Sequence, residues 1–406
     1  MKTSSAPIHI VNGEGVLLFD DRGNSYIDAI SSWWTNLHGH AHPYIAEKVY
    51  EQHKKLEHVI FAGFTHDPAL QLAERLVENH LPKNIHKIFY SDNGSTSVEV
   101  AIKMAIQYWQ NIGYPKKKII AFENAYHGDT FGSMSVSDRG PFTRPFHDYL
   151  FEVEFIPPPF AGNEELSLSR IENIISKNNV AAFIYEPLVM GAGGMLMYAP
   201  EALDNLLKIA KKNNVLCIAD EVMTGFYRTG KMFSGNYCLL QPDIMCLSKG
   251  LTGGTMALGI TACAEFIYNA FLDDNKIKTF YHGHSFTANP LACTSALASL
   301  DLLEKEGMQE NINRIIVSHQ KFAEQLKSIK HFENVRQKGT ILALDIKTDF
   351  STDYFNSIRD SIYDYFILEG ILLRPLGNTL YLMPPYCITN EQLEFIYSKM
   401  LNLKNA

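Results

Sequence analysis

One lysine stands where covalent chemistry is often found in α/β proteins. Lys249 follows the apolar segment Ile244–Leu247 and precedes Gly250, so we expect it at the carboxyl end of a buried strand. Ligands bind at that edge of open α/β sheets. Partial desolvation there would lower the pKa of the amine and free it to form a Schiff base with a carbonyl compound. A surface lysine at a strand end would show the same local pattern, so other residues must decide.

A carboxylate occupies the same kind of position in a second segment. Asp220 follows the apolar segment Val215–Ala219. A carboxylate at a strand end could pair with a protonated ring nitrogen and so keep a pyridine ring charged as an electron sink. Helix capping and magnesium binding are alternative roles for such an aspartate. Asp220 nevertheless strengthens the interpretation of Lys249 as part of a ligand site.

The segment Ser91–Thr96 (SDNGST) connects an expected strand to an expected helix. Main-chain N–H groups at such a helix start bind phosphate, helped by the helix dipole. The segment has neither the lysine of a nucleoside-triphosphate loop nor the glycine spacing of a dinucleotide site. It therefore predicts a site for a single phosphate, with ordinary N-capping by Ser95 or Thr96 as the alternative.

Three aromatic residues could line a site for a planar cofactor and an aliphatic substrate. Trp33 and Trp34 follow a predicted strand, and Tyr126 follows the strand-like segment IIAFEN. An aromatic ring can stack on a planar cofactor or form an apolar wall. Core packing is the alternative for each of them.

The elements that must position these residues alternate between short apolar segments and amphipathic helices. We expect a three-layer α/β domain with a mostly parallel sheet over residues 32–300, because such buried strands carry few charges. The expected strands are Lys87–Ser91, Ile119–Phe122, Ala181–Tyr185, Val215–Ala219 and Ile244–Leu247, with helices over Val98–Trp109 and Pro200–Asn213.

Both ends of the chain are expected to form a smaller α+β domain, residues 1–31 and 301–406. A hairpin is predicted over residues 8–30, around the turn residues 21–24. Toward the other end we expect a strand at TILALDI, a helix over Tyr354–Leu368, strands at ILLRP and TLYLMPP, and a closing helix from Asn390.

Composition limits the classes of function. The 406 residues are 46% hydrophobic and 20% charged, which excludes a wholly disordered chain. A net charge of -8 provides no general field for a nucleic acid. The six cysteines are not spaced as zinc or redox motifs, and no apolar run is long enough to span a bilayer. With no apolar signal segment at the start, we expect a soluble, cytoplasmic protein that binds neither nucleic acid nor membrane.

Several motifs together resemble a known family, the class III aminotransferases of fold type I, which use pyridoxal 5'-phosphate (PLP). The resemblance covers essentially the whole chain. Its class-level motif is Cys217–Gly230 (CIADEVMTGFYRTG), followed by Pro242-Asp243 and Ser248-Lys249-Gly250. Further motifs resemble the branch that acts in biotin biosynthesis: SSWW at 31–34, SDNGS at 91–95, YHGDT at 126–130, GAGGM at 191–195, and Arg374-Pro375 with YLMPPY at 381–386. This branch implies a ping-pong conversion of 8-amino-7-oxononanoate to 7,8-diaminononanoate, with S-adenosylmethionine as the amino donor.

The resemblance also implies roles for individual residues. Lys249 matches the Schiff-base lysine, which afterwards moves a proton between the substrate Cα and C4' of PLP. Asp220 matches the partner of the pyridine nitrogen, and Gly94 and Ser95 match the phosphate cup. Tyr126 matches the ring that stacks on PLP and, like Lys249, a position that contacts substrate.

The remaining implied roles concern substrates and assembly. Trp33 and Trp34 match the wall of the substrate site, and Arg374 matches the arginine that takes the acceptor's carboxylate. In this family, one segment reaches the phosphate of the cofactor in the neighbouring subunit, which implies a homodimer with shared sites. The matching positions here are Gly283, His284 and Ser285, and Gly283 also matches a substrate-binding position. The family usually has Pro-Thr where this chain has His284-Ser285, which keeps a hydroxyl. It also carries Trp-His-Pro-Tyr-Thr just before the position of Met1, where the printed sequence begins.

The sequence alone leaves other interpretations of the function open. Alternating histidines at 38, 40 and 42, and again at 282 and 284, suggest a metal hydrolase, although the nearest acidic residue downstream of the first group is Glu47. A non-catalytic binding protein is another alternative, which the presence of both Lys249 and Asp220 disfavours. Within the PLP class the alternatives are an ω-amino acid or polyamine transaminase, a 2,1-aminomutase, or the same reaction with lysine as donor.

Overall fold

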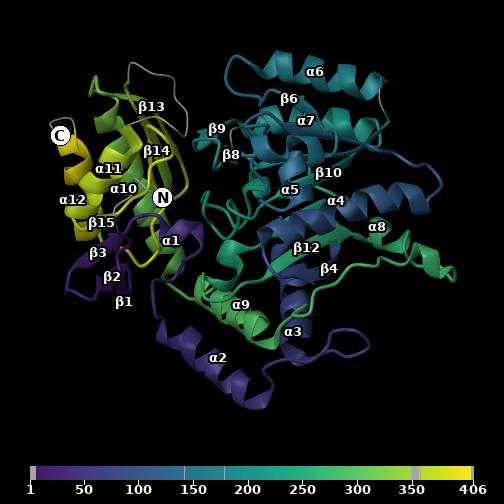
Figure 1. Cartoon of the computed structure of the whole chain (residues 1–406), viewed down its shortest axis with the longest axis horizontal. Coiled ribbons are helices and arrows are strands. Elements are labelled where there is room, and N and C mark those ends of the chain that lie inside the picture. Colours follow the sequence, from purple (N-terminus) through teal and green to yellow (C-terminus); the bar gives the residue numbers. More distant parts are fainter. Residues whose placement is uncertain (1–5, 141, 178, 349–355, 357, 404–406) are drawn as a thin grey trace. The chain divides into compact units, whose positions relative to one another are not determined.

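The computed structural model describes residues 6–403, except 141, 178, 349–355 and 357 (Figure 1). The chain divides into two compact units. One contains residues 48–301, and the other combines both ends of the chain, residues 1–47 and 302–406. Helices α2 (Pro43–Lys55) and α9 (Pro290–Leu303) carry the chain from one unit into the other.

The unit of residues 48–301 is built on a seven-stranded sheet, in the order β4-β12-β11-β10-β7-β5-β6. Neighbouring strands pair in parallel except β12, which is antiparallel to both β11 and β4. The prediction of a mostly parallel sheet is therefore confirmed. The strands are β4 (Ile85–Ser91), β5 (Lys118–Phe122), β6 (Glu154–Ile156), β7 (Val180–Tyr185), β10 (Leu216–Asp220), β11 (Ile244–Leu247) and β12 (Gly259–Ala264).

Helices connect these strands, as the alternating sequence pattern predicts. The connecting helices are α4 (Gly94–Asn111), α5 (Phe131–Val136), α6 (Glu164–Lys177) and α7 (Pro200–Lys212). Helix α3 (Asp67–Arg75) precedes β4, and α8 (Glu265–Asn269) follows β12. A two-stranded hairpin of β8 (Val189–Met190) and β9 (Leu196–Met197) lies after β7. Among the described residues no helix is both long and apolar enough to cross a membrane.

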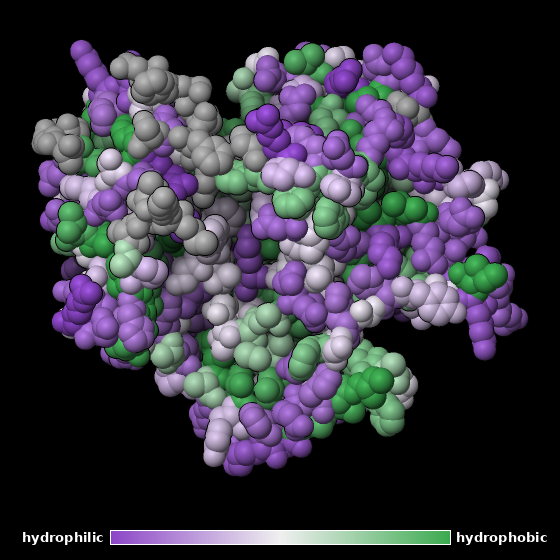
Figure 2. Space-filling model, in the orientation of Figure 1, coloured by the Kyte–Doolittle hydropathy of each residue, from purple (hydrophilic) through white to green (hydrophobic). Residues whose placement is uncertain are grey.

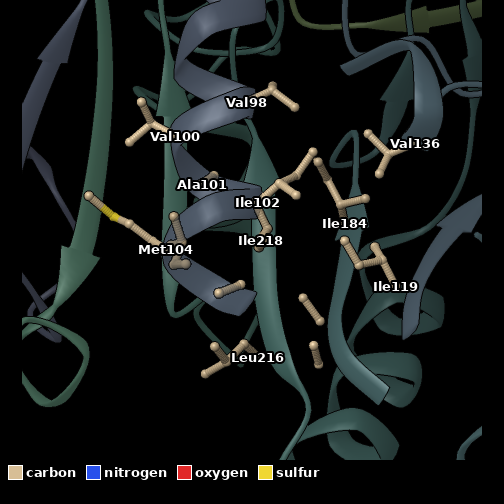
Figure 3. Close-up of a cluster of buried hydrophobic side chains, with 14 of the residues drawn as sticks. Val98, Val100, Ala101, Ile102, Met104, Ile119, Val136, Ile184, Leu216 and Ile218 are labelled. Atoms are coloured by element: carbon tan, nitrogen blue, oxygen red, sulfur yellow. The ribbon is translucent and has the colours of Figure 1, made fainter. Parts of the chain in front are cut away.

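Helix α4 packs its apolar side onto this sheet. Figure 3 shows Val98, Ile102 and other side chains of α4 directed toward residues of the neighbouring strands, such as Ile218 and Ile184. Trp109 also donates its indole N–H to the carbonyl oxygen of Ala181, 2.9 Å away. This packing fixes the start of α4 relative to the strand ends. By contrast, hydrophilic residues cover most of the face seen in Figure 2.

The unit formed by both chain ends contains two smaller sheets. The first has the order β1-β2-β3-β15, and its β2–β3 pair confirms the predicted hairpin. The second has the order β13-β14-β16. The strands are β1 (Ile10–Glu14), β2 (Leu17–Asp20), β3 (Ser25–Asp28), β13 (Phe332–Lys338), β14 (Ile341–Ile346), β15 (Ile371–Leu372) and β16 (Thr379–Leu382).

The helices of this unit are α10 (Met308–Leu326), α11 (Ile358–Leu368) and α12 (Asn390–Asn402), and α1 (Ser31–Trp34) is a short turn whose φ values are positive. The closing helix starts at Asn390, as predicted. The helix predicted over Tyr354–Leu368 corresponds to α11, and the first residues of that prediction lie outside the described ones. Strand β12 was missed, because its sequence GITACA consists mostly of small residues and gives only a weak strand signal.

Candidate active site

Lys249 and Asp220 come from neighbouring parallel strands. Asp220 is the last residue of β10 and pairs in register with Cys246 of β11, three positions before Lys249. Both residues therefore lie at the carboxyl edge of the sheet, as the sequence predicts. Asp220 is buried, and Lys249 is partly buried.

The environment of Lys249 favours its neutral amine. Burial lowers the pKa of the Lys249 amine to about 8, and the positive charge of Arg228 acts in the same direction. The carboxylates of Asp220 and Glu186 oppose this shift. An amine with such a pKa is partly unprotonated near neutral pH, which is the form that attacks carbonyl compounds.

Asp220 is held by a buried histidine that the sequence analysis did not single out. His127 Nδ1 lies 2.7 Å from Asp220 Oδ2, and the main-chain N–H of Val222 donates to Asp220 Oδ1 at 3.0 Å. The His127 Nε2 atom is buried and has no hydrogen-bond partner among the described residues. These contacts orient the carboxylate of Asp220. Ninety-three positions separate the two residues, so no local motif reveals the pairing.

A third strand end adds a buried carboxyl group. Glu186 follows β7 and accepts hydrogen bonds from the main-chain N–H groups of Tyr126, at 3.0 Å, and Gly191, at 2.9 Å. Burial raises the pKa of Glu186 to about 7, and the Asp220 carboxylate adds to this rise, while His127 and the two amides oppose it. The strand-end rule that identified Asp220 could also have identified Glu186.

The start of α4 forms a positively polarised end next to two crowded glycines. Asn93 is the N-cap: its side chain accepts from the Thr96 main-chain N–H at 3.0 Å, and the Thr96 hydroxyl accepts from the Asn93 main-chain N–H at 3.0 Å. N-capping by Ser95 is therefore wrong, while Thr96 takes part in the cap. The main-chain N–H groups of Gly94 and Ser95 have no acceptor among the described residues.

Steric contacts explain why glycine stands at two positions around this helix start. A Cβ atom on Gly94 would lie 2.7 Å from Val222 Cγ1, and one on Gly128 would lie 2.1 Å from Ser95 Oγ. Gly128 also has a φ of 132°, which other residues rarely adopt. The YHGDT segment thus approaches the helix start closely enough to form a small cradle with free main-chain donors, which suits an anion such as phosphate.

Tyr126 lies in the same YHGDT segment and is about 38% exposed. Its hydroxyl donates to Asp129 Oδ2 at 2.9 Å. Partial burial, together with the charge of Asp129, raises the pKa of Tyr126 well above its usual range. The phenol therefore stays protonated, and part of the side chain is accessible to a ligand.

The segment containing Gly283, His284 and Ser285 lies near the cradle formed by the start of α4 and the YHGDT segment. His284 Nδ1 is 3.4 Å from Asp92 Oδ2, two positions before Gly94. His284 Nε2 is also 3.1 Å from His282 Nε2. Gly283 and Ser285 are exposed.

The described residues contain no group of three or more His, Cys, Asp or Glu side chains placed to hold a metal ion.

In the other unit, the two tryptophans differ in their surroundings. Trp33 is 54% exposed, and the guanidinium carbon of Arg374 lies 5.0 Å from the centroid of its ring. Trp34 is buried, and its indole N–H donates to the hydroxyl of Tyr381 at 2.9 Å. No described carboxylate lies within ion-pair distance of Arg374, which is exposed. Trp33 and Arg374 thus form one exposed aromatic and cationic surface.

Comparisons with known proteins show what the whole chain is similar to. The family model described as "Aminotransferase class-III" matches residues 1–403. The adenosylmethionine-8-amino-7-oxononanoate aminotransferase of Synechococcus elongatus is 46% identical, over 99% of this chain and 96% of that protein. The enzyme of the same name from Geobacter sulfurreducens is 40% identical, over 97% and 90%.

Solved structures give the same result for the fold. The crystal structure of the adenosylmethionine-8-amino-7-oxononanoate aminotransferase from Methanocaldococcus jannaschii has a TM-score of 0.93 at 37% identity and covers 99% of this chain and 94% of that chain. A PLP-bound amine transaminase from an uncultivated Pseudomonas species has a TM-score of 0.91 at 28% identity, with coverage of 98% and 94%.

Proposed function

The chain belongs to the class III aminotransferases, and we propose that it converts 8-amino-7-oxononanoate to 7,8-diaminononanoate in biotin biosynthesis, with S-adenosylmethionine as amino donor. It is a transaminase with the fold of the fold-type-I enzymes, and its cofactor is PLP. The observation that carries the choice of substrates is the near full-length similarity to relatives of that name, at 46% and 40% identity.

Lys249, Asp220 and Glu186 lie at the carboxyl edge of the sheet and form what we call the strand-end site. Together with the cradle at the start of α4, these residues fit the cofactor. The free N–H groups of Gly94 and Ser95, in the cradle next to Gly128, suit a phosphate group. The buried carboxylate of Asp220 suits a protonated ring nitrogen, and the Lys249 amine suits an aldehyde. Bound PLP supplies an electrophilic carbon and an electron-withdrawing ring.

Each proposed catalytic residue has a distinct task. Lys249 would hold the cofactor and, once released, would take the proton from the donor's Cα and deliver it to C4'. Asp220, oriented by His127, holds the proton on the ring nitrogen. Tyr126 stacks on the cofactor ring and contacts substrate. Support for these roles comes from the positions of Lys249 and Asp220 at adjacent strand ends and from the lowered pKa of Lys249.

The acceptor requires different groups, since it has a long aliphatic chain that ends in a carboxylate. We assign the aliphatic chain to Trp33, with Gly283 as a further contact, and the carboxylate to Arg374. Trp34 was expected in the same wall, but it is buried and bonded to Tyr381, so the core-packing alternative holds for it. The exposed Trp33–Arg374 stack supports this assignment, because Arg374 has no protein carboxylate as partner among the described residues. A guanidinium can bind a carboxylate through two parallel hydrogen bonds.

We also propose a homodimer in the cytoplasm, with residues 32–300 as the cofactor domain of each subunit. Ser285, and His284 with it, would reach the phosphate of the cofactor bound to the neighbouring subunit; for His284 this requires release of its contact with Asp92 of its own chain. The exposure of Ser285 supports this. All six cysteines are free thiols, five of them buried, which fits a reducing compartment. Mixing inactive Lys249→Ala with inactive Ser285→Ala should restore activity only if sites are shared between subunits.

The direct test of the proposed function is product formation. The PLP-loaded protein is incubated with 8-amino-7-oxononanoate and one donor at a time, S-adenosylmethionine or lysine, and 7,8-diaminononanoate is measured by mass spectrometry. We expect product with S-adenosylmethionine and none with Lys249→Ala. Product with lysine alone would change the donor, whereas turnover only of ω-amino acids or polyamines would contradict the proposed acceptor.

A further inference from the structure

The segment that carries Trp33 has an unusual backbone. Four consecutive residues without a glycine, Ser31 to Trp34, have positive φ values of 53°, 44°, 73° and 75°. Residues other than glycine rarely adopt this left-handed conformation even singly. Such conformations persist only where surrounding contacts determine them, and they gather at functional sites. We call residues 31–34 the Trp33 turn, and the contacts around it show which interactions hold this backbone conformation.

A buried carboxylate holds the turn from one side. The side chain of Asp28 has no exposed surface. Its Oδ2 accepts the hydroxyl hydrogen of Ser32 at 2.7 Å, and its Oδ1 accepts the main-chain N–H of Ile30 at 3.2 Å. Asp28 thus contacts the residue before the turn and the second residue within it. Asp28 also contacts His40, whose Nε2 atom lies 3.0 Å from Asp28 Oδ2.

The hydrogen bonds around His40 define its tautomer. Asn36 Oδ1 accepts the main-chain N–H of Gly39 at 2.7 Å, so its amide nitrogen faces His40 Nδ1, 3.3 Å away. That nitrogen can only donate, so Nδ1 accepts and Nε2 carries the hydrogen that it donates to Asp28. The main-chain N–H of His40 also donates to the carbonyl oxygen of Gly15 at 2.6 Å. His40 is therefore held by its main chain and by both ring nitrogens.

Other contacts fix the rest of the turn but leave the Trp33 ring exposed. Ser31 donates its hydroxyl to the Met383 carbonyl oxygen at 2.7 Å, and Trp34 donates to Tyr381. Trp33 makes no hydrogen bond to any described residue and stacks against the guanidinium of Arg374 instead. The chain of hydrogen bonds through Asn36, His40, Asp28 and Ser32 thus ends directly before the exposed ring.

We propose that Asp28 and His40 are positioning residues: they hold the left-handed turn so that Trp33 stacks on Arg374 and orients this arginine for the far carboxylate of the acceptor. This inference rests on the proposed function, since Trp33 and Arg374 are assigned there to the acceptor. Neither Asp28 nor His40 contacts substrate, and neither contributes to recognition of the donor. Their removal should therefore affect one half-reaction selectively.

The test measures the two half-reactions separately by single-turnover absorbance of the holoenzyme. Asp28→Asn replaces an oxygen that accepts from both Ser32 and His40, and Ser32→Ala removes one donor from an exposed residue. We expect kcat/KM for the acceptor to fall about 10- to 100-fold in Asp28→Asn and about 3- to 10-fold in Ser32→Ala, mainly through KM. The donor half-reaction should change less than about threefold.

A matched control and a double-mutant cycle separate positioning from general damage. Thr35→Ala removes a hydroxyl from the same segment that contacts only main-chain oxygens at 3.4 Å, and it should leave both half-reactions unchanged. In a Trp33→Ala background, Asp28→Asn should have little further effect, because the residue through which it acts is absent. If Asp28→Asn does not fold, Ser32→Ala takes its place in the cycle.

Two results would overturn the inference: equal slowing of both half-reactions, or effects of Asp28→Asn and Trp33→Ala that are additive. A wild-type protein inactive on 8-amino-7-oxononanoate would instead contradict the proposed function. In that case acrylamide quenching still tests the turn, since the chain has three tryptophans and Trp33→Phe isolates one of them. Asp28→Asn should increase the quenching of Trp33, and unchanged quenching would refute positioning by Asp28.

Discussion

The strand-end site around Lys249 and the Trp33 turn represent two ways of placing functional side chains. Asp220 ends one strand, Glu186 directly follows its parallel neighbour, and Lys249 follows the strand on the other side, so regular structure sets their spacing. Trp33 depends on a left-handed turn that hydrogen bonds must hold. The first site is largely buried, and its charges shift each other's pKa values, whereas the second presents an exposed ring and cation.

This difference suggests a division of labour between cofactor chemistry and substrate recognition. Proton transfers need buried groups whose pKa values are shifted by their surroundings. Recognition of a distant carboxylate needs an accessible guanidinium in a defined orientation. Substitutions in the strand-end site should therefore impair both half-reactions, and substitutions in the Trp33–Arg374 surface should impair one.

The largest effect is expected for Asp220→Asn. An amide cannot keep the ring nitrogen of the cofactor protonated, so both half-reactions should slow by roughly 10²- to 10³-fold, or about 3–4 kcal/mol. PLP content and thermal unfolding should stay close to the wild type. The measurement is single-turnover absorbance with each substrate.

The matched control for Asp220→Asn is Glu221→Gln. Glu221 is an equally buried neighbour, but its carboxyl group accepts hydrogen bonds from Thr224 and from the amides of Ser234 and Gly235. Because an amide places an N–H₂ group against one of these donors, Glu221→Gln should lower the unfolding temperature but slow both half-reactions far less than Asp220→Asn does. Near-normal turnover in Asp220→Asn would show that its pairing with the cofactor is misassigned.

A smaller and selective effect is expected for Arg374→Ala. Loss of a charge-assisted hydrogen-bonded pair should raise the activation free energy that corresponds to kcat/KM for 8-amino-7-oxononanoate by about 2–4 kcal/mol. The donor half-reaction should change little. Arg22→Ala removes an exposed arginine of the same unit and serves as the control. Equal loss in both half-reactions would make Arg374 a structural residue.

The smallest effect concerns pH. Since burial lowers the pKa of Lys249 to about 8, the amine is mostly protonated below that pH and neutral above it. The rate at which apo-protein takes up PLP should rise by up to about tenfold per pH unit below pH 8 and level off above it. Stopped-flow absorbance measures this, with Lys249→Ala as the control. A rate that keeps rising through pH 10 would indicate an ordinary exposed lysine.

The two regions also differ in how far the sequence predicts them. Lys249 and Asp220 could be found because short apolar segments mark strand ends, and the same reasoning applied to Val180–Tyr185 would have added Glu186. His127 could not be found this way, because its pairing with Asp220 exists only in the folded chain. Strand β12 escaped because small residues such as those in GITACA resemble a loop.

The Trp33 turn was beyond sequence reasoning for a physical reason. Left-handed backbone is usually signalled by glycine, and none occurs from Ser31 to Trp34. The pattern SSWW also cannot tell which ring is buried, and the structure buries Trp34 but exposes Trp33. Long-range contacts of Trp34 with Tyr381 and of Ser31 with Met383 make this choice.

If the strand-end site binds PLP through Lys249, borohydride reduction of the holoenzyme will mark this lysine. Borohydride should abolish the visible absorbance and fix the cofactor permanently to the lysine that holds it. Peptide mapping by mass spectrometry then identifies that residue. We predict a single modified peptide containing Lys249, with no such product from Lys249→Ala. Stoichiometric label on any other lysine would contradict the account.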